Sequence, residues 1–236
     1  MKAPGEPILK PKPLKGFSHR RAVYVPVDPP SGIFGDVLKK RASREKETYF
    51  GRFFLLDNTA VLYRCIGASS AVIGLEHLIA TGAQEILILG FCGSLNPGIS
   101  CLDVVSINKA YSEEGTSRHY IPGKKIFHSS GLLRQKIESR LAERSLPFLQ
   151  GVTVSTDAPF RETKSWLEDK QKKGIDVVDM EASAVFALGE YHYIPTAALM
   201  IVSDELAGKK WKNVFKYPRL NTKLKEYFIP FLEMPA

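Results

Sequence analysis

Long apolar runs are absent from this chain. Although 44% of its 236 residues are hydrophobic, no stretch reaches the roughly 18 apolar residues that a membrane-spanning helix requires. The first residues carry Lys and Pro and lack the apolar core of a secretory signal. These absences predict a cytoplasmic protein with no membrane partner.

Cysteine is scarce, and no metal-binding motif accompanies it. The three cysteines, Cys65, Cys92 and Cys101, are odd in number and form no Cys-x-x-Cys motif. Two of them stand in or beside predicted strands, which indicates buried free thiols in a reducing compartment. No His or Cys pair has the spacing of metal ligands, so we expect no metal site.

Internal repeats are also absent, and no linker-like segment follows residue 21. The length suits one α/β domain with a sizeable core. Residues 1–16 alternate prolines with lysines, which is typical of an extended arm without a core of its own. We therefore expect a basic, proline-rich N-terminal arm at 1–21 and one domain at 22–236.

The net charge of +8 is concentrated in the two ends of the chain. Residues 1–21 hold six basic side chains and one acid, and residues 205–236 hold seven basic side chains and three acids. The body between them is nearly balanced. Nucleic-acid binding through these ends is one interpretation. A solvated tail is favoured, because no aromatic residue alternates with the lysines before Phe17.

Predicted strands and helices alternate along the domain. The apolar patterns predict strands at 22–27, 53–56, 60–65, 85–91, 104–107, 151–157 and 196–202, the second and third forming a hairpin about Asp57-Asn58. They predict helices at 36–48, 68–81, 132–146, 163–173, 182–191 and 220–232. The helix from residue 68 can be capped by Ser69 or Ser70 and closed by Gly82. Long loops are expected at 111–128 and 205–219.

The segment Val177–Ala184 carries the clearest chemical signal. A short β-branched run ends in Met180-Glu181, and small residues follow with helical spacing. A carboxylate at such a strand-to-helix joint points into the crevice where open α/β sheets bind ligands. Its oxygens can accept the protons of two adjacent sugar hydroxyls. The alternative is an acid that only stabilises the start of the helix.

Other segments extend this pattern. A buried-type strand runs into a Gly-x-x-Gly turn at Gly90 and Gly93, and Ser203-Asp204 ends another apolar run. With Met180-Glu181, Asp103–Ile107 and Glu114–Tyr120, the chain resembles the nucleoside phosphorylase and nucleosidase family from about Ala22 onward. The resemblance implies a three-layer α/β/α sandwich with a mixed central sheet. It also implies an enzyme that cleaves the N-ribosyl bond of a nucleoside without a cofactor.

The resemblance assigns roles to several residues. Glu181 grips the ribose hydroxyls and Met180 packs against the sugar. Asp204 matches the acid placed near N7 of a purine, a role that needs a proton and therefore a raised pKa from burial. A turn cap is the alternative for Ser203-Asp204. Purine is favoured over pyrimidine because Arg161-Glu162-Thr163 does not match the Gln and Arg with which relatives read uracil.

The rest of the expected substrate site is less specific. Phe160 can stack on a base or pack in the core. Ser70 matches a position near the nucleophile. The remaining residues that the resemblance places against the substrate are Ile66, Gly67, Cys92, Gly93 and Ser203.

The phosphate site departs from the phosphorylase pattern. The stretch Val27–Ser31 lacks the expected glycine and the arginine that follows it, and Ile88 and Phe91 replace an arginine and a serine. Only the Gly90 backbone and Arg44 match weakly. Arg44 would enter from a neighbouring subunit, and the alternative is a surface arginine on a charged helix. Inorganic phosphate is thus a possible co-substrate, and a dimer-based homo-oligomer, possibly a hexamer, is implied.

The nucleosidase alternative has its own mismatch. Nucleosidases carry a glutamate near the first strand end to activate water, whereas here the acids between Val23 and Lys40 are Asp28 and Asp36. A third possibility is a family member that binds a nucleoside without turning it over. We expect any base release to depend weakly or not at all on phosphate.

Overall fold

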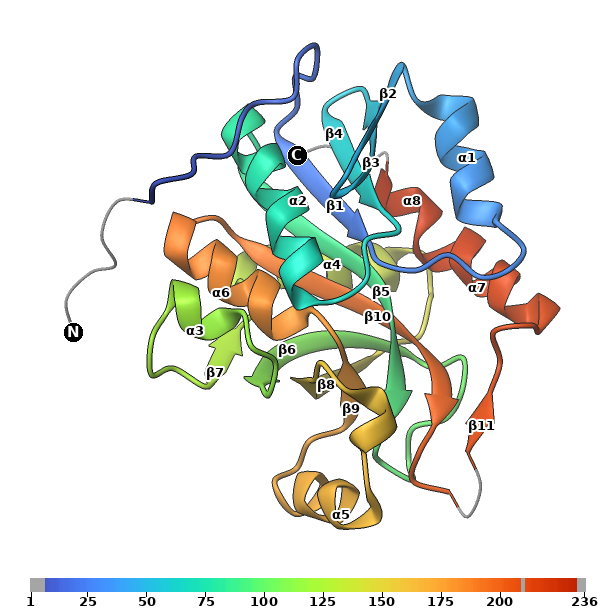
Figure 1. Ribbon diagram of the computed structural model, residues 1–236. Coiled ribbons are helices and arrows are strands. Elements are labelled where there is room, and N and C mark those ends of the chain that lie inside the picture. Colours follow the sequence, from blue (N-terminus) through green and yellow to red (C-terminus); the bar gives the residue numbers. More distant parts are fainter. Residues whose placement is uncertain (1–6, 209–210, 233–236) are drawn as a thin grey trace.

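The computed structural model describes residues 7–208 and 211–232. Within them, eleven strands form one sheet (Figure 1). The strands are β1 (Arg21–Val25), β2 (Arg44–Thr48), β3 (Gly51–Leu56), β4 (Thr59–Tyr63), β5 (Glu85–Ser94), β6 (Val104–Ser112), β7 (Ile126–His128), β8 (Leu149–Ser155), β9 (Val177–Asp179), β10 (Thr196–Glu205) and β11 (Lys212–Asn213). The helices are α1 (Ile33–Arg41), α2 (Ala68–Thr81), α3 (Ser117–Tyr120), α4 (Gly131–Glu143), the 3-10 turn η1 (Pro159–Arg161), α5 (Lys164–Lys172), α6 (Ala182–His192), α7 (Pro218–Tyr227) and α8 (Ile229–Leu232).

The centre of the sheet is parallel and its periphery is mixed. β5 pairs in parallel with β1 and β10, and β1 pairs in parallel with β4. β6 runs antiparallel to β10, and β3 runs antiparallel to β4. β1 and the first part of β10 are continuously buried, as expected for strands covered on both faces.

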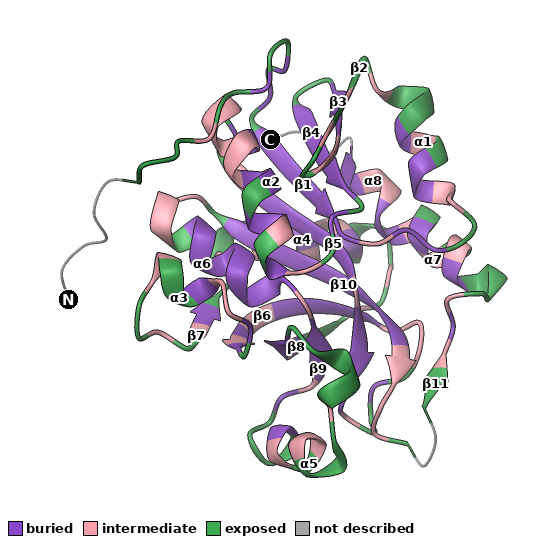
Figure 2. Ribbon diagram, viewed as in Figure 1, coloured by how far each residue is buried: buried purple, intermediate pink, exposed green. Residues whose placement is uncertain are grey.

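Helices cover both faces of this sheet. The apolar sides of α2 and α6 pack with one face in a common core. A second core joins the other face to α1, α4, α7 and α8. Figure 2 shows the buried strands enclosed between the two helical layers. The predicted three-layer α/β/α sandwich with a mixed sheet is therefore confirmed.

The predicted helix over 36–48 is wrong in its second half. α1 ends at Arg41, and Ala42 has an extended backbone. Residues 44–48 form β2, which pairs with β3 at the edge of the sheet. The charged side chains that suggested a helix are those that protect an exposed edge strand from pairing with other chains.

The two predicted long loops contain regular structure. β6 runs to Ser112, and α3 and β7 occupy part of the stretch 111–128. Glu114 organises this stretch, because its buried carboxylate accepts backbone hydrogen bonds from Thr116 and Ser117. Likewise β10 continues to Glu205 and β11 pairs with its end.

Two helix boundaries also differ from the sequence prediction. α2 begins after Gly67, and neither serine caps it through its side chain. Gly82 closes this helix with φ 123°, as predicted. The predicted helix at 220–232 is divided into α7 and α8 at Phe228, because Pro230 has no backbone N–H to continue the ladder.

The described part of the N-terminal segment, residues 7–20, contains no helix or strand. Its end nevertheless packs on the domain. Leu14 and Phe17 are buried in the core beneath α2, and the Leu14 N–H donates to Thr81 Oγ1 at 2.9 Å. Across the described residues, the helices are too short or too polar to cross a membrane.

Candidate active site

Asp179 fixes the joint between β9 and α6. Its buried carboxylate accepts hydrogen bonds from the backbone N–H groups of Glu181 (2.6 Å) and Ala182 (2.7 Å), donors that have no partner inside the helix. The hydroxyls of Thr153 and Ser155 on β8 donate to the same carboxylate, at 2.6 and 2.9 Å. This acid therefore ties the neighbouring strand to the helix start and sets the position of Glu181.

Glu181 is buried and contacts the loop that precedes α2. Its Oε1 accepts a hydrogen bond from the Gly67 N–H at 2.7 Å. Burial raises the pKa of Glu181 to about 8, and the negative charge of Asp179 adds to the rise. The predicted pair Glu181 and Gly67 is thus brought together, although the two residues are far apart in sequence.

Asp204 follows an irregularity in β10. The pairing register with β5 shifts between Val202 and Asp204, so that Ser203 is the extra residue of a bulge. Ser203 Oγ donates to Asp204 Oδ1 at 2.8 Å, and Trp211 Nε1 donates to Oδ2 at 2.8 Å. Both oxygens of Asp204 therefore accept a hydrogen bond.

The two glycines of the predicted Gly-x-x-Gly turn lie inside β5, so the turn prediction is wrong, and each glycine gives room to a neighbouring segment. A Cβ atom on Gly93 would lie 3.3 Å from Asp204 Oδ2 and 2.6 Å from Leu206 Cδ1. A Cβ atom on Gly90 would lie 3.3 Å from Pro26 Cγ. Gly93 lets Asp204 approach β5, whereas Gly90 accommodates the chain that leaves β1.

Glu181 and Asp204 line one cavity of about 360 Å³. It lies at the carboxyl ends of β1, β5, β9 and β10, which is where open α/β sheets bind ligands. The predicted site residues along its wall are Met180, Glu181, Phe160, Ile66, Cys92, Gly93, Ser203 and Asp204.

Phe160 belongs to the wall of this cavity and not to the core. Its side chain is fully exposed on η1, so the core-packing interpretation is wrong. An exposed ring beside a cavity can stack on a planar ligand.

The other predicted residues lie elsewhere. Ser70 lines a neighbouring cavity. Gly90 does not line the candidate cavity, because its buried backbone packs on Pro26. Arg44 lies on β2, where its guanidinium packs against Gly16 of its own chain so closely that a Cβ there would lie 2.8 Å from Cζ.

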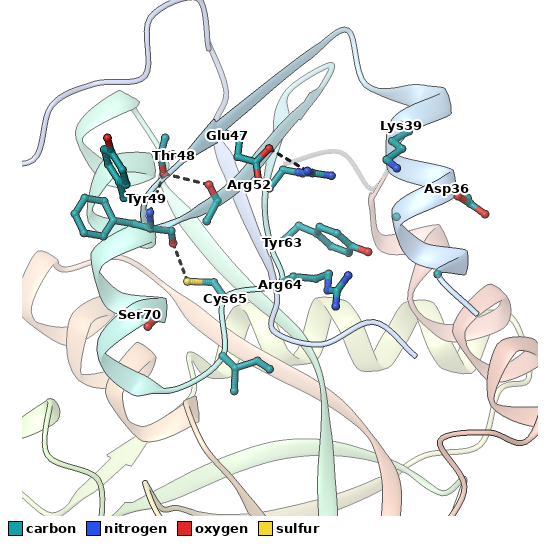
Figure 3. A pocket seen from close by; sticks show the side chains of 15 residues that line it. Asp36, Lys39, Glu47, Thr48, Tyr49, Arg52, Tyr63, Arg64, Cys65 and Ser70 are labelled. Atoms are coloured by element: carbon teal, nitrogen blue, oxygen red, sulfur yellow. Dashed lines mark hydrogen bonds and ion pairs between the residues drawn. The ribbon is translucent and has the colours of Figure 1, made fainter. Parts of the chain in front are cut away.

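The neighbouring cavity of about 620 Å³ opens between α1, β3 and the loop before α2 (Figure 3). Ile66 lines both cavities, so they meet at that side chain. Arg52 lines its wall but pairs with Glu47 at 3.0 Å. Arg64 lines it too, with a left-handed backbone of φ 55°. This second cavity holds the basic side chains that the first one lacks.

Sequence reasoning missed several residues of the first cavity. Glu162, Trp211 and Phe215 all line it. Trp211 and Phe215 lie in the stretch predicted to be a basic loop, where apolar periodicity gives no signal. Glu162 was noted only as a mismatch to pyrimidine-specific relatives, yet its place two residues after Phe160 was an available signal.

All of the charged side chains along the described wall of the first cavity are acidic. Asp179, Glu181, Glu162 and Asp204 line it, and the described wall includes no lysine or arginine. The ring of Phe91, the residue that the sequence resemblance aligns with a phosphate-binding serine, packs on Phe215 at 5.7 Å between centroids. A dianion would be costly in this setting, because it would lack a compensating cation.

A three-layer sandwich with carboxylates converging at the strand ends defines a class of small-molecule site. The model of the Phosphorylase superfamily matches residues 28–232, and the chain therefore belongs to that family. A guanosine phosphorylase of Halorubrum lacusprofundi is 28% identical over 165 residues, which cover 68% of this chain and 67% of that one. A purine nucleoside phosphorylase of Plasmodium falciparum is 29% identical over 140 residues, but only 57% of its length is covered.

Solved structures share the fold. The structure of 5'-methylthioadenosine/S-adenosyl homocysteine nucleosidase from Campylobacter jejuni has a TM-score of 0.77 at 17% identity and covers 91% of this chain and 98% of that one. Purine nucleoside phosphorylase from Toxoplasma gondii, in complex with immucillin-H, has a TM-score of 0.73 at 21% identity and covers 89% and 87%. The same fold thus occurs in proteins named as phosphorylases and as nucleosidases.

Proposed function

We propose that this protein is an enzyme that cleaves the N-ribosyl bond of a purine-type nucleoside. The observation that carries the proposal is the presence of Glu181 and Asp204 on one cavity, with the exposed ring of Phe160 beside them. The cavity volume of about 360 Å³ falls in the range of small-ligand sites. Family membership supports the reaction class.

In the proposed mechanism, Glu181 binds the sugar. The ribose ring gains positive charge as the N-ribosyl bond breaks, and a carboxylate that holds two ring hydroxyls is favoured more in that state than in the ground state. The raised pKa of Glu181 means that the free enzyme holds a proton there near neutral pH. Hydroxyl donors from the substrate favour the ionised form, so binding displaces that proton.

Asp204 assists departure of the base in this mechanism. A proton on its carboxyl group donates to N7 of the purine and offsets the negative charge that develops on the leaving base. Ser203 and Trp211 fix the carboxyl orientation through the two 2.8 Å hydrogen bonds. Phe160 and Met180 supply the apolar walls on which base and sugar rest.

Water is the nucleophile that the cavity favours over phosphate. Phosphate dianions are usually bound by arginine forks, backbone N–H groups and hydroxyls, whereas the described wall carries four acids and no base. Arg64, which lines the adjoining cavity, is our first candidate for a phosphate-binding residue if phosphate is used. We therefore propose that hydrolysis dominates.

We also propose a cytoplasmic homo-oligomer built on dimers. Tyr49 and Ile66 are exposed beside the second cavity, which is the kind of apolar surface that a second copy covers. Arg44 of a neighbouring subunit remains a candidate contact in such an assembly. Light scattering on the purified protein measures the order of the oligomer.

The test is release of free base from purine nucleosides, with and without millimolar phosphate. We expect free ribose as the sugar product, at a rate that phosphate changes less than twofold. Stoichiometric ribose-1-phosphate with saturation by phosphate would show that a basic residue fills the anion site, with Arg64→Ala as the next variant. No base release from any nucleoside would favour the non-catalytic binding protein.

The variant Glu181→Gln tests the sugar contact directly. It keeps the size of the side chain but removes the anionic acceptor, at a cost of roughly 2–4 kcal/mol in the transition state. We expect kcat/KM to fall roughly 30- to 1,000-fold with the fold intact by circular dichroism. The matched control is Glu168→Gln, at an exposed glutamate on α5. Normal turnover in Glu181→Gln would falsify the assignment.

A further inference from the structure

Glu162 is held beside Asp204 by a rigid turn. Its backbone N–H donates to the Pro159 carbonyl at 3.3 Å, which closes η1. Thr163, the next residue, caps α5 by accepting from the Trp166 N–H at 3.2 Å. The residue is therefore fixed from both sides, between η1, whose Pro159 and Phe160 line the candidate cavity, and the start of α5.

The carboxyl group of Glu162 has an unusual environment. The residue is half-buried and, with Asp204, lines both the candidate cavity and an adjoining one of about 480 Å³. Within the described residues, its side chain has neither a hydrogen bond nor an ion pair, whereas Asp204 accepts donors on both oxygens. An unpaired carboxyl group next to a carboxylate is available to a ligand.

The carboxyl groups of Glu162 and Asp204 repel each other when both are ionised. Burial raises the pKa of Glu162 to about 7, and the negative charge of Asp204 adds to the rise. Glu162 therefore keeps its proton to a higher pH than an ordinary glutamate and is still partly protonated near neutral pH. The other ionisable groups on these walls are Lys164 on α5, Cys92 on β5, and Asp179 and Glu181 at the sugar end.

A pair with one proton offers one donor and one acceptor. A 6-aminopurine presents the complementary edge, because N7 accepts and the exocyclic amino group donates. A 6-oxopurine presents two acceptors, N7 and O6. The pair therefore matches the 6-aminopurine at both positions. With a 6-oxopurine, the carboxylate acceptor faces the O6 acceptor, and this mismatch lowers the affinity.

We propose that Glu162 is a specificity residue that reads the exocyclic amino group of a 6-aminopurine nucleoside while Asp204 serves N7. When the base binds, the shared proton moves from Glu162 to Asp204, so that Asp204 donates to N7 and the Glu162 carboxylate accepts from the amino group. No proton is gained or lost by the pair. The inference rests on the proposed function for the orientation of the base.

Calorimetric titration with adenosine and inosine tests this assignment on the intact chain. The wild-type protein is expected to bind adenosine at least tenfold more tightly than inosine at pH 7. Glu162→Gln replaces the anionic acceptor with an amide, and we expect it to weaken adenosine at least tenfold while inosine changes less than threefold. Glu168→Gln, on the exposed side of α5, is expected to match the wild type.

The outcomes separate this inference from the proposed function. Equal affinity for the two nucleosides, a preference for inosine, or equal weakening of both by Glu162→Gln would overturn the role of Glu162. Base release tested in parallel reports the function: binding with the expected ratio but without base release would overturn only the catalytic proposal. Glu162→Ala, checked for an unchanged melting temperature, repeats the test if the amide itself contacts the base. Absence of binding by either nucleoside would overturn both proposals.

Discussion

At the scale of single residues, Glu181 combines a buried position with an ionisable side chain. Its usual pKa of 4.5 rises to about 8 in the folded protein. The unfolded chain therefore loses this proton from about pH 4.5 upward, whereas the folded chain keeps it until about pH 8. The contribution of Glu181 to the free energy of unfolding therefore has its full value below pH 4.5 and decreases as the pH rises to 8.

Glu181→Gln removes this pH dependence. Because the neutral amide carries no ionisation cost, we expect the variant to gain stability relative to the wild type as the pH rises from 5 to 8, by a few kcal/mol at the upper end. Thermal melts at several pH values measure the difference. A constant difference between pH 5 and 8 would show that Glu181 is ionised in the folded protein at lower pH.

Residue-level prediction from the sequence succeeded where a motif has a local cause. The strand-to-helix joint at Glu181 is visible in the order of residue types, whereas the turn predicted from Gly90 and Gly93 is wrong because β5 continues through both glycines. The Glu162–Asp204 proximity was not visible, because it depends on where η1 lies relative to β10. Arg44 shows the same limit, since its packing against Gly16 is set by the path of the N-terminal segment.

At the scale of elements, the joint between β9 and α6 depends on the acceptors of one side chain. Asp179→Ala leaves two helix N–H groups and two hydroxyls without their acceptor. Each of these donors that finds no water or protein acceptor lowers the folding stability by about 1–3 kcal/mol. We expect a melting temperature several degrees lower, since 1 kcal/mol is worth about 2–4 °C in a chain of this size. A lower kcat/KM should follow, because Glu181 begins at this joint.

Asp179→Asn is the matched comparison. The amide oxygen can still accept from the N–H groups of Glu181 and Ala182, and Thr153 can rotate its hydroxyl to accept from the amide. We expect most of the stability and kcat/KM to be retained. Equal losses in both variants would mean that the charge of Asp179, and not its acceptors, positions Glu181.

Elements were predictable in proportion to their apolar pattern. Buried strands such as β1, β5 and β10 follow continuous apolar runs, and amphipathic α4 follows a helical period. β2 has no such run, because its charged side chains are exposed at the sheet edge. The start of α3 depends on the buried Glu114, whose partners include Ser183 on distant α6, and the three-residue β7 depends on its pairing with β6. Local sequence therefore carries little information about either element.

At the scale of the whole molecule, the N-terminal segment tests where the domain begins. Removal of residues 1–9 leaves the Leu14–Thr81 hydrogen bond in place, and we expect an unchanged melting temperature. Removal of residues 1–17 also takes away buried Leu14 and Phe17, worth roughly 1.5–3 kcal/mol each, and should lower it by several degrees. Equal melting temperatures for both truncations would mean that the segment contributes no packing energy.

The same truncations examine the basic charge of this segment. A solvated tail predicts no binding of duplex or single-stranded nucleic acid at physiological salt. Binding at low micromolar protein that falls steeply with salt, and that weakens when residues 1–17 are removed with their four lysines, would overturn that interpretation.

The parallel pairing of β5 with β10 has a consequence for biosynthesis. This pairing aligns Ile86 with Thr196. In the order of synthesis, β5 therefore has no β10 to pair with until most of the chain has left the ribosome. Until then β5 presents an unpaired apolar edge, which is prone to aggregation. Pairings between distant segments also form slowly. The wall that carries Asp204 is thus completed late, and we expect nascent chains to need protection from chaperones until β10 is made.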